Sequence, residues 1–187
     1  MKRTFSFFAL ALAAALTLAG CGNGDPANDM SGNSQEASSG SGEADATSKP
    51  PWPAPTDVPA RVAAAGLDLG PMGTAEHYHP QLQIIIAGKE VQVPANIGVD
   101  PATGAMSALH THETDGTIHI EADTVGEVFT LGQLFTEWGV ELTATQIGGV
   151  KAKAGETVAI TSNGSTVAGD PGDLRLEPDQ KIVLRLP

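Results

Sequence analysis

The chain contains a single cysteine, Cys21, among its 187 residues. One cysteine cannot form a disulfide framework, and it cannot supply the several thiolates of a zinc-thiolate site or an iron–sulfur cluster. Basic residues are also scarce, because 10 Lys and Arg stand against 22 Asp and Glu and give a formal net charge of −12. This acidic balance argues against nucleic acid as a partner, since its phosphates require a basic surface.

The N-terminal residues have the pattern of an export signal. Lys2 and Arg3 precede an apolar run, Phe5 to Leu18, which is about as long as a secretory signal and too short to span a bilayer as a stable helix. The run leads into Leu-Ala-Gly-Cys at residues 18–21, which resembles a bacterial lipobox. The resemblance implies that residues 1–20 are a lipoprotein signal peptide and that Cys21 carries fatty acids, such as palmitate, as a membrane anchor. An ordinary signal peptide with a coincidental cysteine is the alternative.

Lipidation of Cys21 would leave no free thiol, which also excludes a Cys-containing blue-copper site and a cysteine nucleophile. We therefore expect an extracytoplasmic protein in the cell envelope, attached to a membrane through this lipid. Cleavage before Cys21 removes two basic residues and no acid, so the mature chain has 8 basic and 22 acidic residues and a formal charge of −14. Such a charge argues against electrostatic binding to anionic lipid.

Composition divides the mature chain into a tether and one domain. Residues 22–48 have almost no large apolar side chain and cannot offset the entropy of ordering, so we expect them to be disordered. Residues 49–59, KPPWPAPTDVP, are expected to form a stiffer proline-rich spacer, which completes a tether over residues 21–59. Residues 60–187 then form a single globular domain of ordinary size.

The pattern of the domain predicts hairpins around one amphipathic helix. The helix, residues 130–138, has Thr130 as N-cap, Gln133 at capping-box spacing and an apolar face with period 3.6. Asn163-Gly164 favours a type I′ turn in one hairpin. The other predicted elements are a short helix (60–67), a hairpin (82–93) turning at Gly88-Lys89, a hairpin (109–121) turning at Asp115-Gly116, a hairpin (158–167) and a closing strand (181–186).

This order predicts an α+β fold in which a small, mostly antiparallel sheet packs against the helix at residues 130–138. The sequence of hairpin, helix, hairpin and strand resembles a β-grasp arrangement. An all-β barrel or sandwich is the alternative.

All five histidines lie within one 43-residue stretch, and four of them form two His-x-His pairs. Imidazole is the commonest protein metal ligand, and side chains two residues apart share a face of a strand. If Asp115-Gly116 is a two-residue turn, His112 lies opposite His119 and His110 lies opposite Glu121, so all four share one side of the hairpin. We therefore predict a metal site on His110, His112 and His119, which His77 and His79 join if their segment is a neighbour.

Other side chains could complete or support such a site. Glu121, Glu113, Asp115 and Glu76 could bind the ion directly or orient an imidazole. Met72 and Met106 lie shortly before the two His-x-His pairs, and their thioethers would favour Cu(I), although core packing is the simpler interpretation of both. Imidazole and carboxylate ligands suit Cu and Zn equally, so the metal stays open between these two.

Known catalytic motifs do not fit the chain. The string His-Thr-His-Glu-Thr-Asp at residues 110–115 resembles the His-x-His-x-Asp-His signature of metallo-β-lactamase-type hydrolases, but its aspartate is one place late and the next histidine is missing. The His-x-His pairs also resemble those of cupins, without the glutamate spacing that follows. HExxH and Gly-x-Ser-x-Gly motifs are absent.

Three segments together resemble a group of small exported or membrane-attached prokaryotic proteins that is uncharacterised. They are Val-Pro-Ala-Asn-Ile-Gly (93–98), Leu-His-Thr-His-Glu-Thr-Asp-Gly-Thr-Ile-His-Ile-Glu (109–121) and Phe-Thr-Leu-Gly-Gln-Leu-Phe-Thr-Glu-Trp-Gly (129–139), and they follow the first His-x-His pair. The resemblance implies that these segments belong to one module, and it adds no activity.

The sequence thus predicts a membrane-anchored lipoprotein that binds Cu or Zn for capture, buffering or delivery, with a metal transporter or a metalloenzyme as its partner. Catalysis is the less favoured alternative: a small metal-dependent enzyme, cupin-like or hydrolytic, with Glu113 or Glu121 as base. A third possibility is a metal-free interaction module whose histidines form a pH-sensitive surface.

Overall fold

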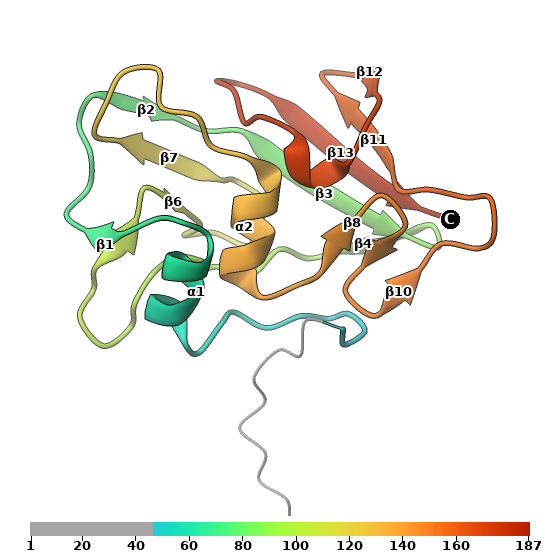
Figure 1. Ribbon diagram of the computed structural model, residues 1–187, viewed down its shortest axis with the longest axis horizontal. Coiled ribbons are helices and arrows are strands. Elements are labelled where there is room, and N and C mark those ends of the chain that lie inside the picture. Colours follow the sequence, from blue (N-terminus) through green and yellow to red (C-terminus); the bar gives the residue numbers. More distant parts are fainter. Residues whose placement is uncertain (1–46) are drawn as a thin grey trace, which may run out of the picture. The chain divides into compact units, whose positions relative to one another are not determined.

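The computed structural model describes residues 47–187 (Figure 1). The predicted signal peptide, Cys21 and most of the predicted tether lie outside the described residues. Within the described part, the α+β prediction is confirmed, since open sheets, mostly antiparallel, pack with two α-helices. Neither helix of this part combines the length and the hydropathy that a membrane span requires.

The largest sheet has five strands in the order β12-β11-β13-β3-β4. Central β13 pairs with β3 in parallel over six residue pairs, and the other neighbours are antiparallel. This order, with a hairpin at each edge and the last strand in the middle, resembles the β-grasp arrangement that the sequence suggested. The strands are β3 (Gln81–Ile86), β4 (Lys89–Val91), β11 (Ala159–Ser162), β12 (Ser165–Val167) and β13 (Lys181–Leu186).

Two-residue turns close the hairpins at both edges of this sheet. Asn163 and Gly164 have φ values of 51° and 80°, as the predicted type I′ turn requires. In the β3–β4 hairpin the turn is Ala87-Gly88, because Ile86 lies opposite Lys89. The predicted turn at Gly88-Lys89 is therefore wrong by one residue.

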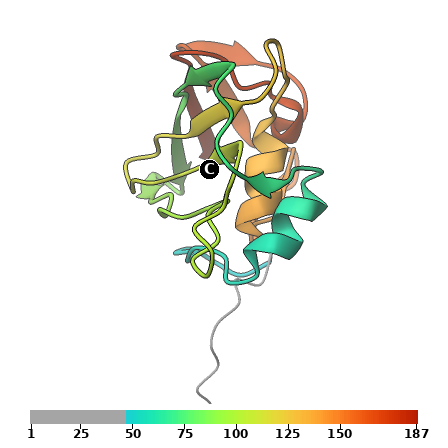
Figure 2. The same cartoon turned by 90° about the vertical axis from the view of Figure 1, so that its left-hand side faces the viewer.

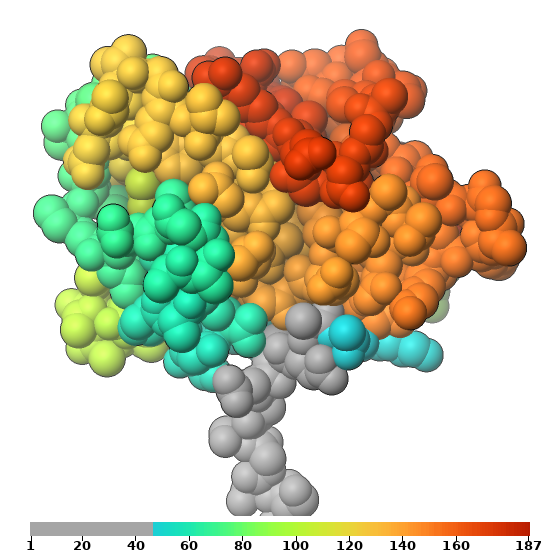
Figure 3. Space-filling view, in the orientation of Figure 1, coloured from blue at the N-terminus to red at the C-terminus, as the bar shows by residue number. Residues whose placement is uncertain are grey.

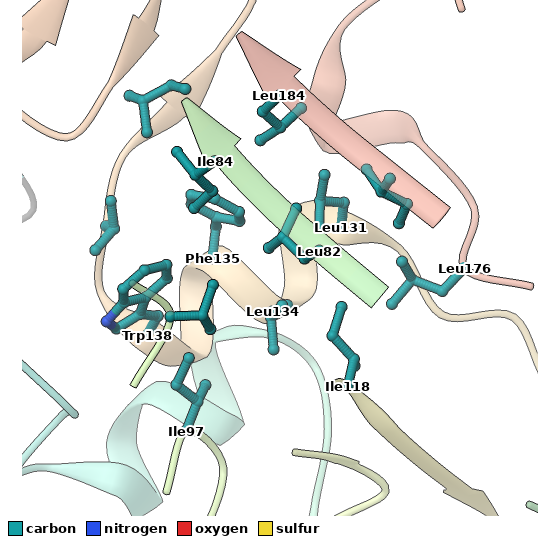
Figure 4. Packing of buried hydrophobic residues seen from close by; sticks show 14 of the residues in the cluster. Leu82, Ile84, Ile97, Ile118, Leu131, Leu134, Phe135, Trp138, Leu176 and Leu184 are labelled. Carbon is teal, nitrogen blue, oxygen red and sulfur yellow. The ribbon is translucent and has the colours of Figure 1, made fainter. Parts of the chain in front are cut away.

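Helix α2 (Leu131–Trp138) packs its apolar face in the core, as predicted. Thr130 and Gln133 form the expected capping box, and Gly139 ends the helix in the left-handed conformation with φ of 77°. The presence of this helix in the core excludes the all-β alternative. Figure 4 shows its side chains gathered with apolar residues of β3 and β13, among them Leu82, Ile84, Leu131, Leu134, Phe135, Trp138 and Leu184.

The folded body begins earlier than residue 60. Trp52 is only 2% exposed, and its ring makes an edge-on contact with Trp138 at a centroid distance of 5.7 Å. Its indole N–H donates to the carbonyl oxygen of Ser48 at 2.8 Å. The proline-rich residues 49–59 are therefore not a free spacer, because their tryptophan is part of the core.

Helix α1 (Val58–Ala64) is the short helix expected at residues 60–67, displaced toward the N-terminus because Pro59 lies in its first turn. It buries Val58 and Val62. It also packs against α2, and its surface forms the blue-green part of Figure 3. Short elements that the sequence did not predict complete this part of the fold. They are β1 (Leu69–Gly70), β5 (Met106–Ser107), β8 (Leu142–Thr143), β9 (Gln146–Ile147), β10 (Val150–Lys151) and the 3-10 helix η1 (Pro171–Asp173).

A separate three-stranded sheet carries the histidines. Its order is β2 (Glu76–Tyr78), β7 (His119–Ala122) and β6 (Leu109–His110), all antiparallel (Figures 1 and 2). The chain passes from β2 to β3 of the large sheet through Pro80, which has no N–H for a ladder hydrogen bond. His79 lies directly before this proline, at the junction of the two sheets.

Candidate metal centre

The central strand β7 separates the core from the candidate site. Ile120 and Ala122 are fully buried on one face, while His119 and Glu121 alternate with them on the other. Strand β2 pairs with β7 on one side and places His77 opposite Glu121. The two His-x-His segments are therefore neighbours across β7. This meets the condition under which His77 and His79 were predicted to join the site.

The register predicted for the second hairpin is wrong. His110, and not His112, lies directly opposite His119, and His110 does not face Glu121. The displacement is by two residues, so every side chain keeps the face that the prediction gave it. The predicted grouping of the three histidines survives for this reason.

The register differs because residues 116–118 pair with the β2–β3 junction, whereas the prediction paired residues 117 and 118 with residues 114 and 113. The Gly116 carbonyl accepts from the Leu82 N–H at 2.9 Å, and the Ile118 N–H donates to the Pro80 carbonyl at 2.9 Å. Gly116 has φ of 86°, and a Cβ there would lie 2.1 Å from the Leu82 carbonyl oxygen. Only glycine fits this contact, so Asp115-Gly116 belongs to a longer loop and not to a two-residue turn.

Thr111 holds the backbone between His110 and His112. It is fully buried, and its hydroxyl donates to the Pro94 carbonyl at 2.9 Å and accepts from the Ile97 N–H at 3.1 Å. Its own N–H and carbonyl bond to the same segment. This segment belongs to the Val-Pro-Ala-Asn-Ile-Gly motif at residues 93–98. The motif therefore supports the backbone of the second His-x-His pair, which gives a physical reason why the two segments belong to one module.

The five imidazole rings form one continuous cluster. Ring centroids are 4.6 Å apart for His77 and His79, 4.6 Å for His79 and His119, 4.9 Å for His112 and His119, and 4.7 Å for His110 and His112. His110 and His119 stack at 5.4 Å with an interplanar angle of 15°. The residues that the sequence selected are thus brought together from three strands and the segments that follow them.

Two sets of three histidines are close enough to hold one ion each. In the outer triad, His77, His79 and His119, and in the inner triad, His110, His112 and His119, one nitrogen per ring lies within 4.8 Å of the others. The Nε2 atoms of His110 and His112 are 3.1 Å apart. Two nitrogens bound to one zinc ion at about 2.0–2.1 Å in tetrahedral geometry lie roughly 3.3–3.4 Å apart, so little movement is needed.

His110 is oriented by its surroundings. Its Nδ1 lies 2.8 Å from the Ser107 carbonyl oxygen, which can only accept, so Nδ1 carries the proton and the lone pair of neutral His110 is on Nε2. Burial lowers the pKa of this imidazole to about 4, and the hydrogen bond to Ser107 opposes the decrease. The ring therefore stays neutral and ready to bind a metal over most of the physiological range.

The outer side of the cluster is more exposed. The side chain of His77 is 56% exposed, compared with 15% for His119. Burial also lowers the pKa of His79, with the neighbouring His119 and His77 as further causes. The cluster thus runs from solvent at β2 to the protein interior at β6.

Two of the four predicted acids lie beside the imidazoles. Glu113 Oε2 is 3.0 Å from His119 Nε2, and Glu121 Oε1 is 3.5 Å from His77 Nε2. Such carboxylates can orient an imidazole or offset the charge of an ion. Glu76 accepts instead from the Gly126 N–H at 3.1 Å, and Asp115 accepts from the Thr117 N–H at 2.9 Å, a bond that lowers its pKa.

The two methionines occupy different surroundings. Met106 lies in β5, where it pairs with Gly70 of β1. Met72 is partly exposed between β1 and β2. Their predicted role as soft ligands stays a prediction.

Sequence reasoning missed Glu137, a buried acid of α2. Its side chain is fully buried, and neither carboxyl oxygen has a hydrogen-bond partner among residues 47–187. Burial raises its pKa to about 8, and the nearby Ser107 hydroxyl offsets this rise only in part. A Cβ atom placed on Gly98 would lie 3.0 Å from Glu137 Oε2 and 3.2 Å from the Cβ of His110, so the carboxyl group of Glu137 lies near His110. The only sequence signal was its position three residues after Leu134, at the margin of the apolar face.

Searches against protein-family models, curated proteins and solved structures find no match to this chain. The geometry of the histidine cluster is therefore the basis for any functional conclusion.

Proposed function

We propose that this protein is a membrane-anchored extracytoplasmic lipoprotein that binds Cu or Zn through its histidine cluster, for metal capture, buffering or delivery to a transporter or a metalloenzyme. The convergence of five imidazoles from segments up to 42 residues apart in the sequence supports the metal-binding part most strongly. The lipobox-like residues 18–21 support the envelope location.

The donor set fits a borderline divalent ion. Three imidazoles with nearby carboxylates and no thiolate suit Zn(II) and Cu(II). His110 Nδ1 is already bonded to a backbone carbonyl, which is the arrangement that presents the other ring nitrogen to a metal. Because the outer histidines are exposed to solvent, an ion can reach the cluster without a conformational change of the core.

Metal analysis of protein purified without a polyhistidine tag tests this proposal. We expect about one equivalent of Zn or Cu to remain bound after gel filtration, and a double variant, His112→Ala with His119→Ala, to lose it. Both residues lie outside the buried core, so the variant should keep its fold, which circular dichroism checks. Equal metal contents in the two proteins would refute the proposal.

The lipoprotein part is tested separately. Mass spectrometry of the protein from its membrane fraction should show a mature N-terminus at Cys21 carrying acyl chains, and Cys21→Ser should abolish both cleavage at this point and membrane attachment. An unmodified Cys21 in the purified mature protein would contradict this part and leave the metal site untouched.

A metal-dependent enzyme is the second candidate. Three histidine ligands leave a fourth position for water, and Glu113, beside His119, is half exposed and could accept a proton. Metal-dependent hydrolysis of a test ester that is lost in Glu113→Gln, with metal content unchanged, would favour this candidate over simple binding.

A further inference from the structure

The two triads share one residue. Within the part of the chain that the structure describes, His119 belongs both to the outer triad with His77 and His79 and to the inner triad with His110 and His112. Its ring contacts His79 on one side and His110 and His112 on the other. The central position of β7 in the sheet produces this sharing, because β2 and β6 flank it on opposite sides.

A neutral imidazole has only one lone pair, since its other nitrogen carries a proton. His119 can therefore complete one triad at a time, unless a second ion removes its remaining proton. Resting on the metal-binding function proposed above, we propose that the cluster is a two-position relay for a single ion, in which His119 is the exchange ligand. An incoming ion binds the outer triad first and passes to the inner triad without leaving the protein.

The direction of the relay follows from burial and orientation. Two residues of the outer triad, His77 and His79, are exposed, whereas His112 is the one exposed residue of the inner triad, so the outer triad is the part that a free ion or a donor protein meets first. His110 is fully buried and its Nδ1 is fixed by Ser107, so the inner triad loses less freedom when it binds. The inner position is therefore the tighter one, and the reverse step presents the ion to an acceptor at the outer position.

A carboxylate lies beside each triad. Glu121 lies beside His77 of the outer triad, and Glu113 lies beside His119 of both. Negative charge is thus available wherever the ion is held, so neither position leaves a dication among neutral rings alone.

Three single substitutions test the relay with Zn²⁺ as the probe. His79→Ala breaks the outer triad, His112→Ala breaks the inner one, and His119→Ala breaks both. All three side chains are partly or largely exposed, so the fold should persist in each variant. Competition against a chromophoric chelator gives the affinities, and stopped-flow mixing with Zn²⁺ gives the rate of capture.

We expect one Zn²⁺ per molecule in the parent protein and in the variants that keep one triad. Loss of a supporting partner typically weakens metal binding 10–100-fold, so loss of a ligand from both triads in His119→Ala should weaken it about 100-fold or more. His112→Ala, which keeps the outer triad, should lose about tenfold, and His79→Ala should change the affinity least while slowing capture.

Several results would overturn the relay. Binding of two Zn²⁺ ions by the parent protein would show that both triads fill at once. An affinity of His119→Ala equal to that of either other variant would show that the residue is not shared, and unchanged capture in His79→Ala would remove the outer step. Absence of any Zn²⁺ or Cu²⁺ binding by the parent protein is a distinct outcome, which refutes the proposed function and the relay with it.

Discussion

Glu137 provides a test of the buried environment behind the candidate site. Burial raises its pKa from an ordinary value of 4.5 to about 8, so the folded protein keeps a proton that the unfolded chain releases. Between these two values the folded state binds more protons than the unfolded state, and this residue therefore lowers stability as the pH rises from about 4.5 to about 8. Below pH 4.5 its effect disappears, and above pH 8 it is constant.

The size of the effect follows from the two pKa values. At about 1.36 kcal/mol per pH unit, the full difference corresponds to about 5 kcal/mol above pH 8, of which about 3 kcal/mol is present at pH 7 and about 1 kcal/mol at pH 5. Glu137→Gln keeps the shape of the side chain and removes its ionisation. The free energy of unfolding of the variant, minus that of the parent protein, should therefore increase by about 2–3 kcal/mol from pH 5 to pH 7.

Urea unfolding at a series of pH values, followed by tryptophan fluorescence in metal-free buffer, measures this difference. His110 is buried in its neutral form, so it makes the stability of the parent protein rise with pH from about 4 to about 6.5 and partly hides the effect of Glu137. Subtracting the parent protein from the variant removes this contribution of His110. Glu141→Gln, at an exposed position further along the chain, is the matched control. A difference that stays constant from pH 5 to pH 8 would show that Glu137 is solvated or ionised in the folded protein, and that burial does not raise its pKa.

Three further substitutions test the packing that positions the site. Trp52→Ala should destabilise the protein by about 3–5 kcal/mol in urea unfolding, because it removes a buried ring, whereas a mobile spacer would show almost no effect. Thr111→Val leaves the Pro94 carbonyl and the Ile97 N–H without their side-chain partner, and calorimetry should show a loss of about 1–3 kcal/mol together with weaker Zn²⁺ binding. Gly116→Ala combines a positive φ with a backbone clash and should cost more than about 1 kcal/mol; an unchanged melting temperature would contradict the close contact with β3.

Local signals in the sequence predicted the elements that local chemistry determines. The capping box at Thr130 and Gln133 identified α2, and Asn163-Gly164 identified the turn between β11 and β12. The face of His110 and His119 was also predictable, because the period of two in a strand survives an error of two residues in register. The five histidines of the candidate site were all selected from the sequence.

Features that depend on distant segments could not be predicted. The register of β6 and β7 is set by two hydrogen bonds with the β2–β3 junction, more than 30 residues earlier in the chain: the Gly116 carbonyl accepts from the Leu82 N–H, and the Ile118 N–H donates to the Pro80 carbonyl. The burial of Trp52 depends on its contact with Trp138, while the composition around it is typical of a linker. Glu137 is polar at a position that the helical period leaves ambiguous, and its burial depends on residues such as Gly98 and His110 that are distant in the sequence.

X-ray absorption spectroscopy of the Zn-loaded or Cu-loaded protein, purified without a tag, identifies the side chains that hold the ion. If the histidine cluster binds the metal, three of the nearest ligands are imidazoles, at about 2.0–2.1 Å for zinc, with the multiple-scattering pattern of histidine and no sulfur. The pattern should change on His119→Ala. A metal bound without imidazole scattering, or a protein that retains no metal at all, would contradict metal binding by the histidine cluster.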